Sequence, residues 1–271
     1  MKLTSILILS VCVLSGCGST GNGNDSSVGV LSGNWQLTLI RHNDSTQFPY
    51  SGFLLQSGSS ISGSLILNAG NGCGGVGPVT GTVNGQTFQM DVNQFGGDLI
   101  LTGGVPAAGS SGGSTMSGQF STLANGCNFF SSSTGTWTAF QVAPISGSFH
   151  GTFVSPTNGT LAVTGTLNQG PNIGSSNAQL TGTITASNST TPFCPYLTTG
   201  TLSGVISGTT VMLNIYGPNG AQMGAIPAGS PPDAQGVVTP DGKSLSGSYV
   251  FSELSLPSCP EEQGNMSITL P

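Results

Sequence analysis

The first half of the sequence is repeated in the second half. Residues 79–92, VTGTVNGQTFQMDV, align without a gap with residues 202–215, LSGVISGTTVMLNI, and their glycines and apolar residues stay in register. Other motifs recur in the same order: residues 32–35 match 146–149, residues 61–65 match 180–184, and residues 116–120 match 245–249. Because the order is the same in both halves, the sequence predicts two duplicated domains, over residues 32–142 and 143–271.

Apolar and polar residues alternate within each half. Trp35, Leu37 and Leu39, for example, alternate with Gln36 and Thr38. A period of two residues places one face of a strand against a core and the other face in water. No stretch after the amino-terminal region combines good helix formers with a spacing of 3.6 residues. The sequence therefore predicts an all-β fold.

Short turns separate the alternating runs. Asn84-Gly85 lies between two such runs and is typical of a type I′ hairpin turn, and Ser207-Gly208 takes the same place in the second half. Hairpins this tight join antiparallel strands. We predict about eight strands in the first half, near residues 33–41, 51–56, 60–68, 78–84, 86–93, 97–103, 115–121 and 134–141.

Several predicted strands have a central glycine flanked by serine or threonine, as in residues 180–184. A glycine inside a strand marks a sharp bend or a close approach of two backbones. The strand order, with Trp35 near the start of the first strand and Trp137 in the last, resembles the small up-and-down barrels of the lipocalin and avidin type. This resemblance in layout implies two tandem antiparallel meander domains, each a closed β-barrel. A β-sandwich fits the same periodicity and is the alternative.

The amino terminus has the pattern of an export signal. Lys2 precedes an apolar run over residues 3–14, which is too short to span a bilayer and is typical of a secretory signal peptide. The run ends in Leu14-Ser15-Gly16-Cys17, which resembles the lipobox of bacterial lipoproteins. The resemblance implies cleavage of residues 1–16 and acylation of Cys17, with an amide-linked fatty acid such as palmitate. Several acyl chains anchor a protein stably. An ordinary signal peptide is the alternative.

Residues 17–31 join the predicted anchor to the first domain. They are rich in glycine, serine and asparagine without any periodicity, which is typical of a flexible tether. In lipoproteins an aspartate after the acylated cysteine favours retention in the inner membrane, whereas this chain has Gly18. The resemblance therefore implies a lipid-anchored protein of the bacterial cell envelope, at the outer rather than the inner membrane.

Four cysteines remain once cleavage has removed Cys12 and acylation has used Cys17. Four cysteines permit three connectivities, and the repeat favours one disulfide in each domain, as suits an exported protein. The predicted pairs are Cys73–Cys127 and Cys194–Cys259. None of them has CxxC spacing or a nearby histidine, so we predict no metal site and no cofactor.

Charged residues make up only 4% of the chain, with 3 lysines and arginines against 9 acids and a net charge of −6. Nucleic-acid binding needs a basic surface and is not expected. Catalysis needs clustered titratable groups, and the two histidines, His42 and His150, lie in different repeats. We therefore expect a protein that is not an enzyme. A hydrolase would require residues 41–44 to meet Asp91 or Asp98 in a cleft.

Two kinds of residue are candidates for contact with a ligand. Arg41 and His42 belong to the densest polar stretch, which is either a solvated loop or the mouth of a site. Six aromatic residues are predicted in or near loops, where exposed rings would stack on sugars or line a barrel mouth: Phe48, Tyr50, Phe129, Phe130, Phe193 and Tyr196. The last four flank cysteines and join Arg41 and His42 as candidate contacts. Glu261 and Glu262 are expected to be solvated rather than to bind a cation.

These features favour a non-enzymatic binding or surface-structural module on the cell envelope. A polar surface with little charge suits hydrogen bonding to neutral glycans or to protein partners rather than to ionic ones. The first alternative is a carrier of small apolar ligands inside each barrel, which requires an internal cavity on the order of several hundred Å³. A hydrolase is the second alternative.

Overall fold

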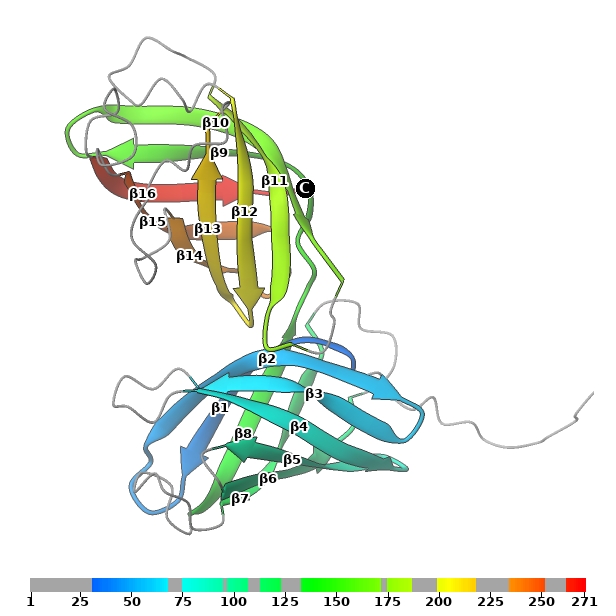
Figure 1. Ribbon diagram of the computed structural model, residues 1–271. Coiled ribbons are helices and arrows are strands. Elements are labelled where there is room, and N and C mark those ends of the chain that lie inside the picture. The colour runs from blue at the N-terminus through cyan, green and yellow to red at the C-terminus, as the bar shows by residue number, and fades with distance from the viewer. Residues whose placement is uncertain are drawn as a thin grey trace, which may run out of the picture.

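The computed structural model describes residues 31–67, 75–94, 97–106, 113–122, 133–171, 175–186, 199–217, 234–251 and 262–271. These residues form sixteen strands and contain no helix. The strands make two closed antiparallel barrels, one after the other in the sequence (Figure 1). The prediction of two tandem up-and-down β-barrels is confirmed, and the sandwich alternative is excluded.

Each barrel is a meander in which every strand pairs with the next and the last pairs with the first. Barrel 1 consists of β1 (Gly33–Arg41), β2 (Gln47–Ser57), β3 (Ser60–Leu67), β4 (Gly75–Asn84), β5 (Thr87–Gln94), β6 (Gly97–Gly104), β7 (Thr115–Thr122) and β8 (Thr134–Val142). Barrel 2 consists of β9 (Ser146–Ser155), β10 (Gly159–Gln169), β11 (Ala178–Ala186), β12 (Gly200–Ser207), β13 (Thr210–Tyr216), β14 (Ala234–Val238), β15 (Ser244–Phe251) and β16 (Glu262–Thr269).

Strand β2 begins earlier than the sequence predicts. Phe48 and Tyr50 were expected in or near a loop, but both lie in β2 and are only 1% exposed. The sequence predicts this strand near residues 51–56, whereas β2 runs from Gln47 to Ser57. In the barrel Pro49 is opposite Thr38 of β1 and is exposed between the buried Phe48 and Tyr50.

The two predicted hairpin turns are present, but their type differs from the prediction. Asn84 pairs with Thr87, so Gly85 is the first of the two central residues, with φ of +61°. A glycine in that position is the signature of a type II′ turn rather than type I′. The equivalent turn between β12 and β13 has Gly208 in the same position, with φ of +54°.

Interior glycines make room for aromatic rings in barrel 1. Gly103 of β6 is opposite Gly118 of β7, which is opposite Trp137 of β8. A Cβ atom on Gly103 would lie 2.8 Å from the Trp137 ring. The indole N–H of Trp137 donates to the carbonyl oxygens of Thr102 at 3.2 Å and Gln119 at 3.1 Å. The fully buried tryptophan therefore packs against these two strands and also hydrogen-bonds to their backbones.

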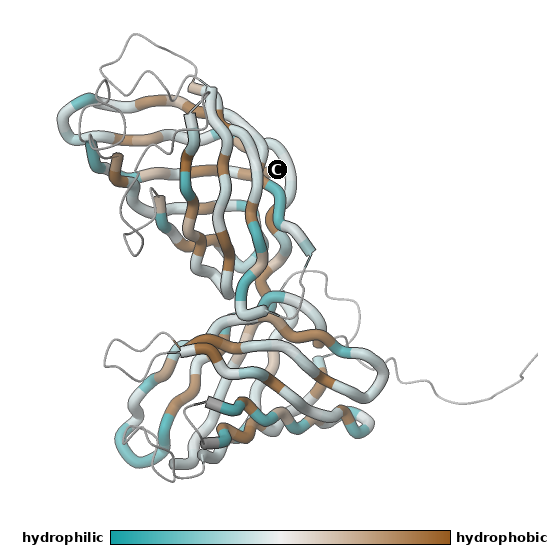
Figure 2. Tube along the Cα trace, viewed as in Figure 1, coloured by the Kyte–Doolittle hydropathy of each residue, from teal (hydrophilic) through white to brown (hydrophobic). Residues whose placement is uncertain are grey.

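Barrel 2 uses the same arrangement with other rings. Phe149 occupies the space that a side chain at Gly165 would need, and Tyr249 occupies the space at Gly264. Tyr249 packs edge-on against Phe153, with ring centroids 4.8 Å apart. Apolar residues recur along the strands of both barrels (Figure 2), and the buried ones form one core cluster in each.

The two barrels contact each other through the β12–β13 turn, which meets β1 and β2 (Figure 1). The Asn34 amide donates to the Gly208 carbonyl at 2.8 Å and accepts from the Gly208 N–H at 2.7 Å. The hydroxyls of Ser51 and Ser207 share a hydrogen bond of 2.8 Å. Phe53 of β2 is buried in the core cluster of barrel 2. The barrels are therefore packed together rather than joined by a linker alone.

We expect the substitution Gly103→Ala to destabilise barrel 1 by about 2 kcal/mol, the usual cost of overpacking a core. The added methyl group would lie 2.7 Å from the Ser117 carbonyl oxygen and 2.8 Å from the Trp137 ring. Gly104→Ala is the matched control, because the nearest atom to its Cβ would be 3.9 Å away. Urea unfolding followed by tryptophan fluorescence reports on barrel 1, since it contains both Trp35 and Trp137. Equal stability of the two variants would contradict the packing described above.

Asn34→Ala should destabilise the chain by about 1–3 kcal/mol, because it leaves the N–H and carbonyl of Gly208 without their partner in a buried contact. Ser148→Ala is the control, since Ser148 is the repeat equivalent of Asn34 and is exposed. Thermal unfolding of both variants, followed by circular dichroism, tests this expectation. A melting temperature for Asn34→Ala equal to that of Ser148→Ala would show that the contact between the barrels adds no stability.

Candidate binding surface

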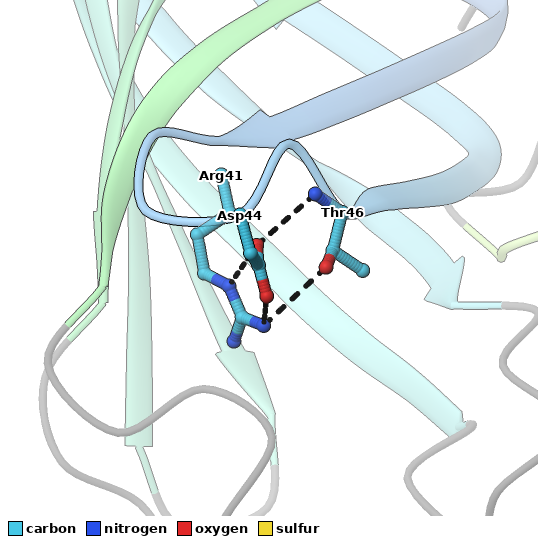
Figure 3. A network of polar contacts seen from close by, with 3 residues as sticks. All are labelled: Arg41, Asp44 and Thr46. Carbon is cyan, nitrogen blue, oxygen red and sulfur yellow. Dashed lines mark hydrogen bonds and ion pairs between the residues drawn. The ribbon is translucent and has the colours of Figure 1, made fainter.

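Arg41, at the end of β1, is engaged in a local network (Figure 3). Its guanidinium forms a bidentate ion pair with Asp44, with the Nε–Oδ1 distance at 2.9 Å, and lies 5.6 Å from the centre of the Phe48 ring. The hydrogen bond from Arg41, together with that from the Thr46 N–H, holds the pKa of Asp44 well below its ordinary range. This network closes the β1–β2 turn, as expected of a solvated loop.

His42 is exposed next to Arg41, and its backbone N–H donates to the carbonyl of Thr134 in β8 at 3.0 Å. Its contact with a ligand stays a prediction, as does that of Arg41. The other predicted site residues lie outside the described residues, and their roles likewise stay predictions. They are the acylated Cys17, the disulfide cysteines Cys73, Cys127, Cys194 and Cys259, and the loop aromatics Phe129, Phe130, Phe193 and Tyr196.

The described titratable residues are spread over the molecule. Arg41 ends β1 and residues 42–44 follow it. Asp91 faces outward from β5, which is four strands from β1 in either direction around the eight-stranded barrel. His150 is exposed on β9 of the other barrel. Within the described ranges no three histidine, cysteine or acidic residues are grouped closely enough to hold a metal ion. The same ranges contain no helix long and apolar enough to cross a membrane.

One prediction about acidic residues is wrong. Glu262 was expected to be solvated, but it lies at the start of β16 with only 3% of its surface exposed. The Tyr249 hydroxyl donates a hydrogen bond of 3.0 Å to its Oε1 atom. The strand alternation explains the burial, because Glu262 faces the same side as Met266 and Ile268. Glu261 lies outside the described residues.

A hollow of about 620 Å³ lies on the outside of barrel 1, over β4 to β7. Its central row consists of Thr82, Gln89, Thr102 and Gln119, which are directly opposite one another in adjacent strands. All four side chains are exposed. Successive residues of a strand face opposite sides, so Gln89 and Thr102 point outward where their neighbours Phe88 and Leu101 point into the core. The rest of the lining consists of Asn84, Thr87, Phe88, Gly103, Gly104, Ser117 and Gly118. We call this surface the barrel 1 hollow.

The core of barrel 1 holds the floor of this hollow in place. Trp137 donates its indole N–H to the backbone carbonyls of Thr102 and Gln119, whose side chains point outward into the row. Gly103 and Gly118 line the hollow from the same strands. The position of the outer side chains is therefore coupled to the packing of a fully buried tryptophan.

The lining of the barrel 1 hollow is neutral and polar. Threonine and serine hydroxyls both donate and accept hydrogen bonds, and each asparagine or glutamine amide offers two N–H donors and a carbonyl acceptor. The nearest carboxylate on the same face of β5 is Asp91, whose pKa is raised by desolvation and by the charge of Asp98. The lining therefore contains both hydrogen-bond donors and hydrogen-bond acceptors, but it has no charged group to pair with an ionic ligand.

The polar row is specific to barrel 1. The repeat places Val205 and Met212 of barrel 2 at the positions of Thr82 and Gln89. Met212 is in turn opposite Gln235, which is opposite Ser248, so the equivalent row in barrel 2 begins with two apolar residues. Met212 is 43% exposed. The two copies of the domain therefore present different chemistry on equivalent faces.

No protein-family model and no curated protein matches the sequence of this chain. The barrel fold by itself does not define an activity, because one fold carries many functions. The chemistry of the described surfaces is therefore the basis for a functional proposal.

Proposed function

We propose that this protein is a lipid-anchored binding module of the bacterial cell envelope, which recognises a neutral, hydroxyl-rich ligand such as a glycan through the barrel 1 hollow. The observation that supports the proposal is the row of Thr82, Gln89, Thr102 and Gln119 in a hollow of about 620 Å³. Such a volume is within the range of small-ligand sites. Sugar hydroxyls both donate and accept hydrogen bonds, as the amides and hydroxyls of this row do.

The packing of the interiors favours an outer surface over a carrier function. A carrier needs free volume inside the barrel. In barrel 1 the interior contains Trp35 and Trp137, both 0% exposed, and Phe88 lies against Trp137 with ring centroids 5.9 Å apart. In barrel 2 the interior contains the rings of Phe153, Tyr249 and Phe251 in mutual contact. Rings of this size occupy the space that an apolar ligand would need.

The proposed anchor is supported by the sequence Leu14-Ser15-Gly16-Cys17. A chain with a net charge of −6 has no electrostatic attraction to anionic lipid headgroups, so its attachment would depend on acyl chains at Cys17. The role is that of a non-enzymatic module held at the membrane, at the outer rather than the inner membrane.

The anchor is tested by the variant Cys17→Ser, expressed with its full signal sequence in a bacterial host. We expect the variant to leave the membrane fraction and to lose incorporation of labelled palmitate, because serine has no thiol to accept the lipid. Cys12→Ala is the control, since residue 12 lies in the predicted signal peptide and should not affect anchoring. Palmitate labelling and membrane association that survive in Cys17→Ser would refute the anchor.

Ligand binding is tested on an array of neutral and acidic glycans, using the mature chain. We expect binding to neutral glycans, and a loss of at least about tenfold in affinity in the double variant Gln89→Ala/Gln119→Ala. Each lost hydrogen bond is worth about 1 kcal/mol, and about 1.4 kcal/mol corresponds to tenfold. The matched control is Gln179→Ala/Gln235→Ala, which removes two exposed glutamines from the outside of barrel 2. The glycan proposal fails if no neutral glycan binds or if both double variants bind equally well.

A further inference from the structure

The barrel 1 hollow contains two parallel rows of residues that cross the strands. The first is the central row described above, and the second lies nearer the β4–β5 turn. In the second row Asn84 is opposite Thr87, which is opposite Gly104. Ser117 completes this row, because it lies two residues before Gln119 on β7 and is exposed on the same side. Two residues along a strand separate the rows, a distance of about 7 Å.

Gly104 leaves the middle of the second row open. It has the parity of Thr102 on β6, so a side chain at this position would point outward. A Cβ atom there would come no closer than 3.9 Å to the Gln86 carbonyl oxygen, its nearest neighbour. Thr87 and Ser117, on the two adjacent strands, are exposed on either side. A ligand can therefore lie over Gly104 with polar side chains on both sides of it.

Along the strands the neutral surface of the hollow is short. On β5 the next outward residue after Gln89 is Asp91, which is opposite Ile100 of β6. A carboxylate and a half-buried aliphatic side chain thus replace the amides and hydroxyls of the two rows. In the other direction β4 ends at Asn84. The two rows therefore have no neutral polar continuation on β5 and β6 in the direction of the strands.

Across the strands the neutral surface is longer than the hollow itself. Ser60 of β3 is opposite Thr82, and Thr136 of β8 is opposite Gln119. Ser60 and Thr136 carry hydroxyls but do not line the hollow. The central row therefore continues as a line of neutral polar residues from β3 to β8, and the hollow takes up its middle four strands. An elongated neutral ligand would lie across the strands rather than along them.

The spacing of the central row indicates what kind of elongated ligand fits. Neighbouring strands lie about 4.8 Å apart, so the row offers one polar side chain about every 5 Å. Threonine and glutamine alternate along it, so the same side chain recurs at every second strand. In a β-1,4-linked glycan each pyranose advances the chain by about 5 Å, close to the strand spacing. Each sugar is also turned over relative to the one before, so the same edge recurs at every second sugar.

We propose that the barrel 1 hollow binds a linear β-1,4-linked glycan that crosses β4 to β7, with one sugar over each strand. The inference rests on the proposed function, since it specifies the ligand of the same site. Because alternate sugars are turned over, both edges of the chain need polar partners, and the two rows supply them. The Thr102 hydroxyl donates to the Gln119 carbonyl at 3.3 Å, so it presents its lone pairs to a sugar hydroxyl.

The experiment measures how affinity depends on chain length and linkage. Cellobiose, cellotriose, cellotetraose and cellohexaose are titrated into the mature chain by isothermal calorimetry. We expect the affinity to rise about fivefold with each sugar from two to four, the value of one hydrogen bond, and then to level off. Maltotetraose has the same four glucose units in α-1,4 linkage. It should bind at least about tenfold more weakly than cellotetraose, because its coiled chain misses two or more of these hydrogen bonds.

Two matched variants locate the end of the bound chain. Thr82→Val removes a hydroxyl at one end of the central row, inside the hollow, whereas Thr136→Val removes one from the strand beyond the other end. Valine keeps the shape of threonine and suits a strand. Thr82→Val should abolish the gain in affinity between cellotriose and cellotetraose. Thr136→Val should leave the whole series unchanged.

The length series on the parent chain tests the inference even if a variant does not fold. Four results would overturn it while leaving a shorter or differently shaped sugar site: an affinity that stops rising at the disaccharide, one that still rises fivefold per sugar up to six, equal binding of the two tetrasaccharides, or the same length dependence in both folded variants. If no neutral glycan binds at all, the proposed function fails together with the inference.

Discussion

Both barrels depend on the packing of large aromatic side chains against glycines on neighbouring strands. A closed barrel of eight strands has little internal space, and full-sized residues at every inward position would not fit around a tryptophan. Gly103 solves this problem for Trp137, because it leaves the ring the space that a side chain would take, and Gly118 allows the close approach of the β6 backbone at Thr102. The indole N–H then finds two carbonyl acceptors in the wall itself, so the polar atom of the ring is satisfied without water.

The same packing determines what the outer surface presents. In barrel 1 the carbonyls that Trp137 engages belong to Thr102 and Gln119, whose side chains form part of the outer hollow. In barrel 2 the missing side chain at Gly264 allows Tyr249 to reach Glu262 and to fix one of its two oxygens. In both barrels a glycine on a neighbouring strand thus leaves an aromatic side chain the room in which it makes its hydrogen bond.

The sequence was sufficient for the fold because its signals are local. Alternation such as that of Trp35, Leu37 and Leu39 defines which face of a strand is buried, and a glycine between two such runs defines a hairpin. The hollow of barrel 1 could not be predicted in this way, because the row from Thr82 to Gln119 requires the register of four strands at once. Register depends on pairing along the whole sheet rather than on any single segment.

The burial of Glu262 was indicated by the alternation of residues along β16, but the pair of adjacent glutamates suggested a solvated turn instead. Two neighbouring glutamates are typical of a solvated turn, yet Glu262 has the same parity as Met266 and Ile268 and therefore begins a strand on its core side. Phe48 and Tyr50 were predicted in or near a loop, yet both are buried on the core side of β2, on either side of the exposed Pro49. In both places the period of two residues was a better guide than the character of one residue.

The two copies of one hairpin have different surroundings in the two barrels. The turn between β4 and β5 lies beside the barrel 1 hollow, to which Asn84 and Thr87 contribute, whereas its copy between β12 and β13 is fastened to β1 through Asn34 and Gly208. Phe53 completes that attachment from β2, because its ring is buried in the core cluster of the other barrel. Separating the copies would expose this ring and leave the amide of Asn34 without its partner. Although each barrel closes upon itself, part of the surface that each would expose alone is covered by the other.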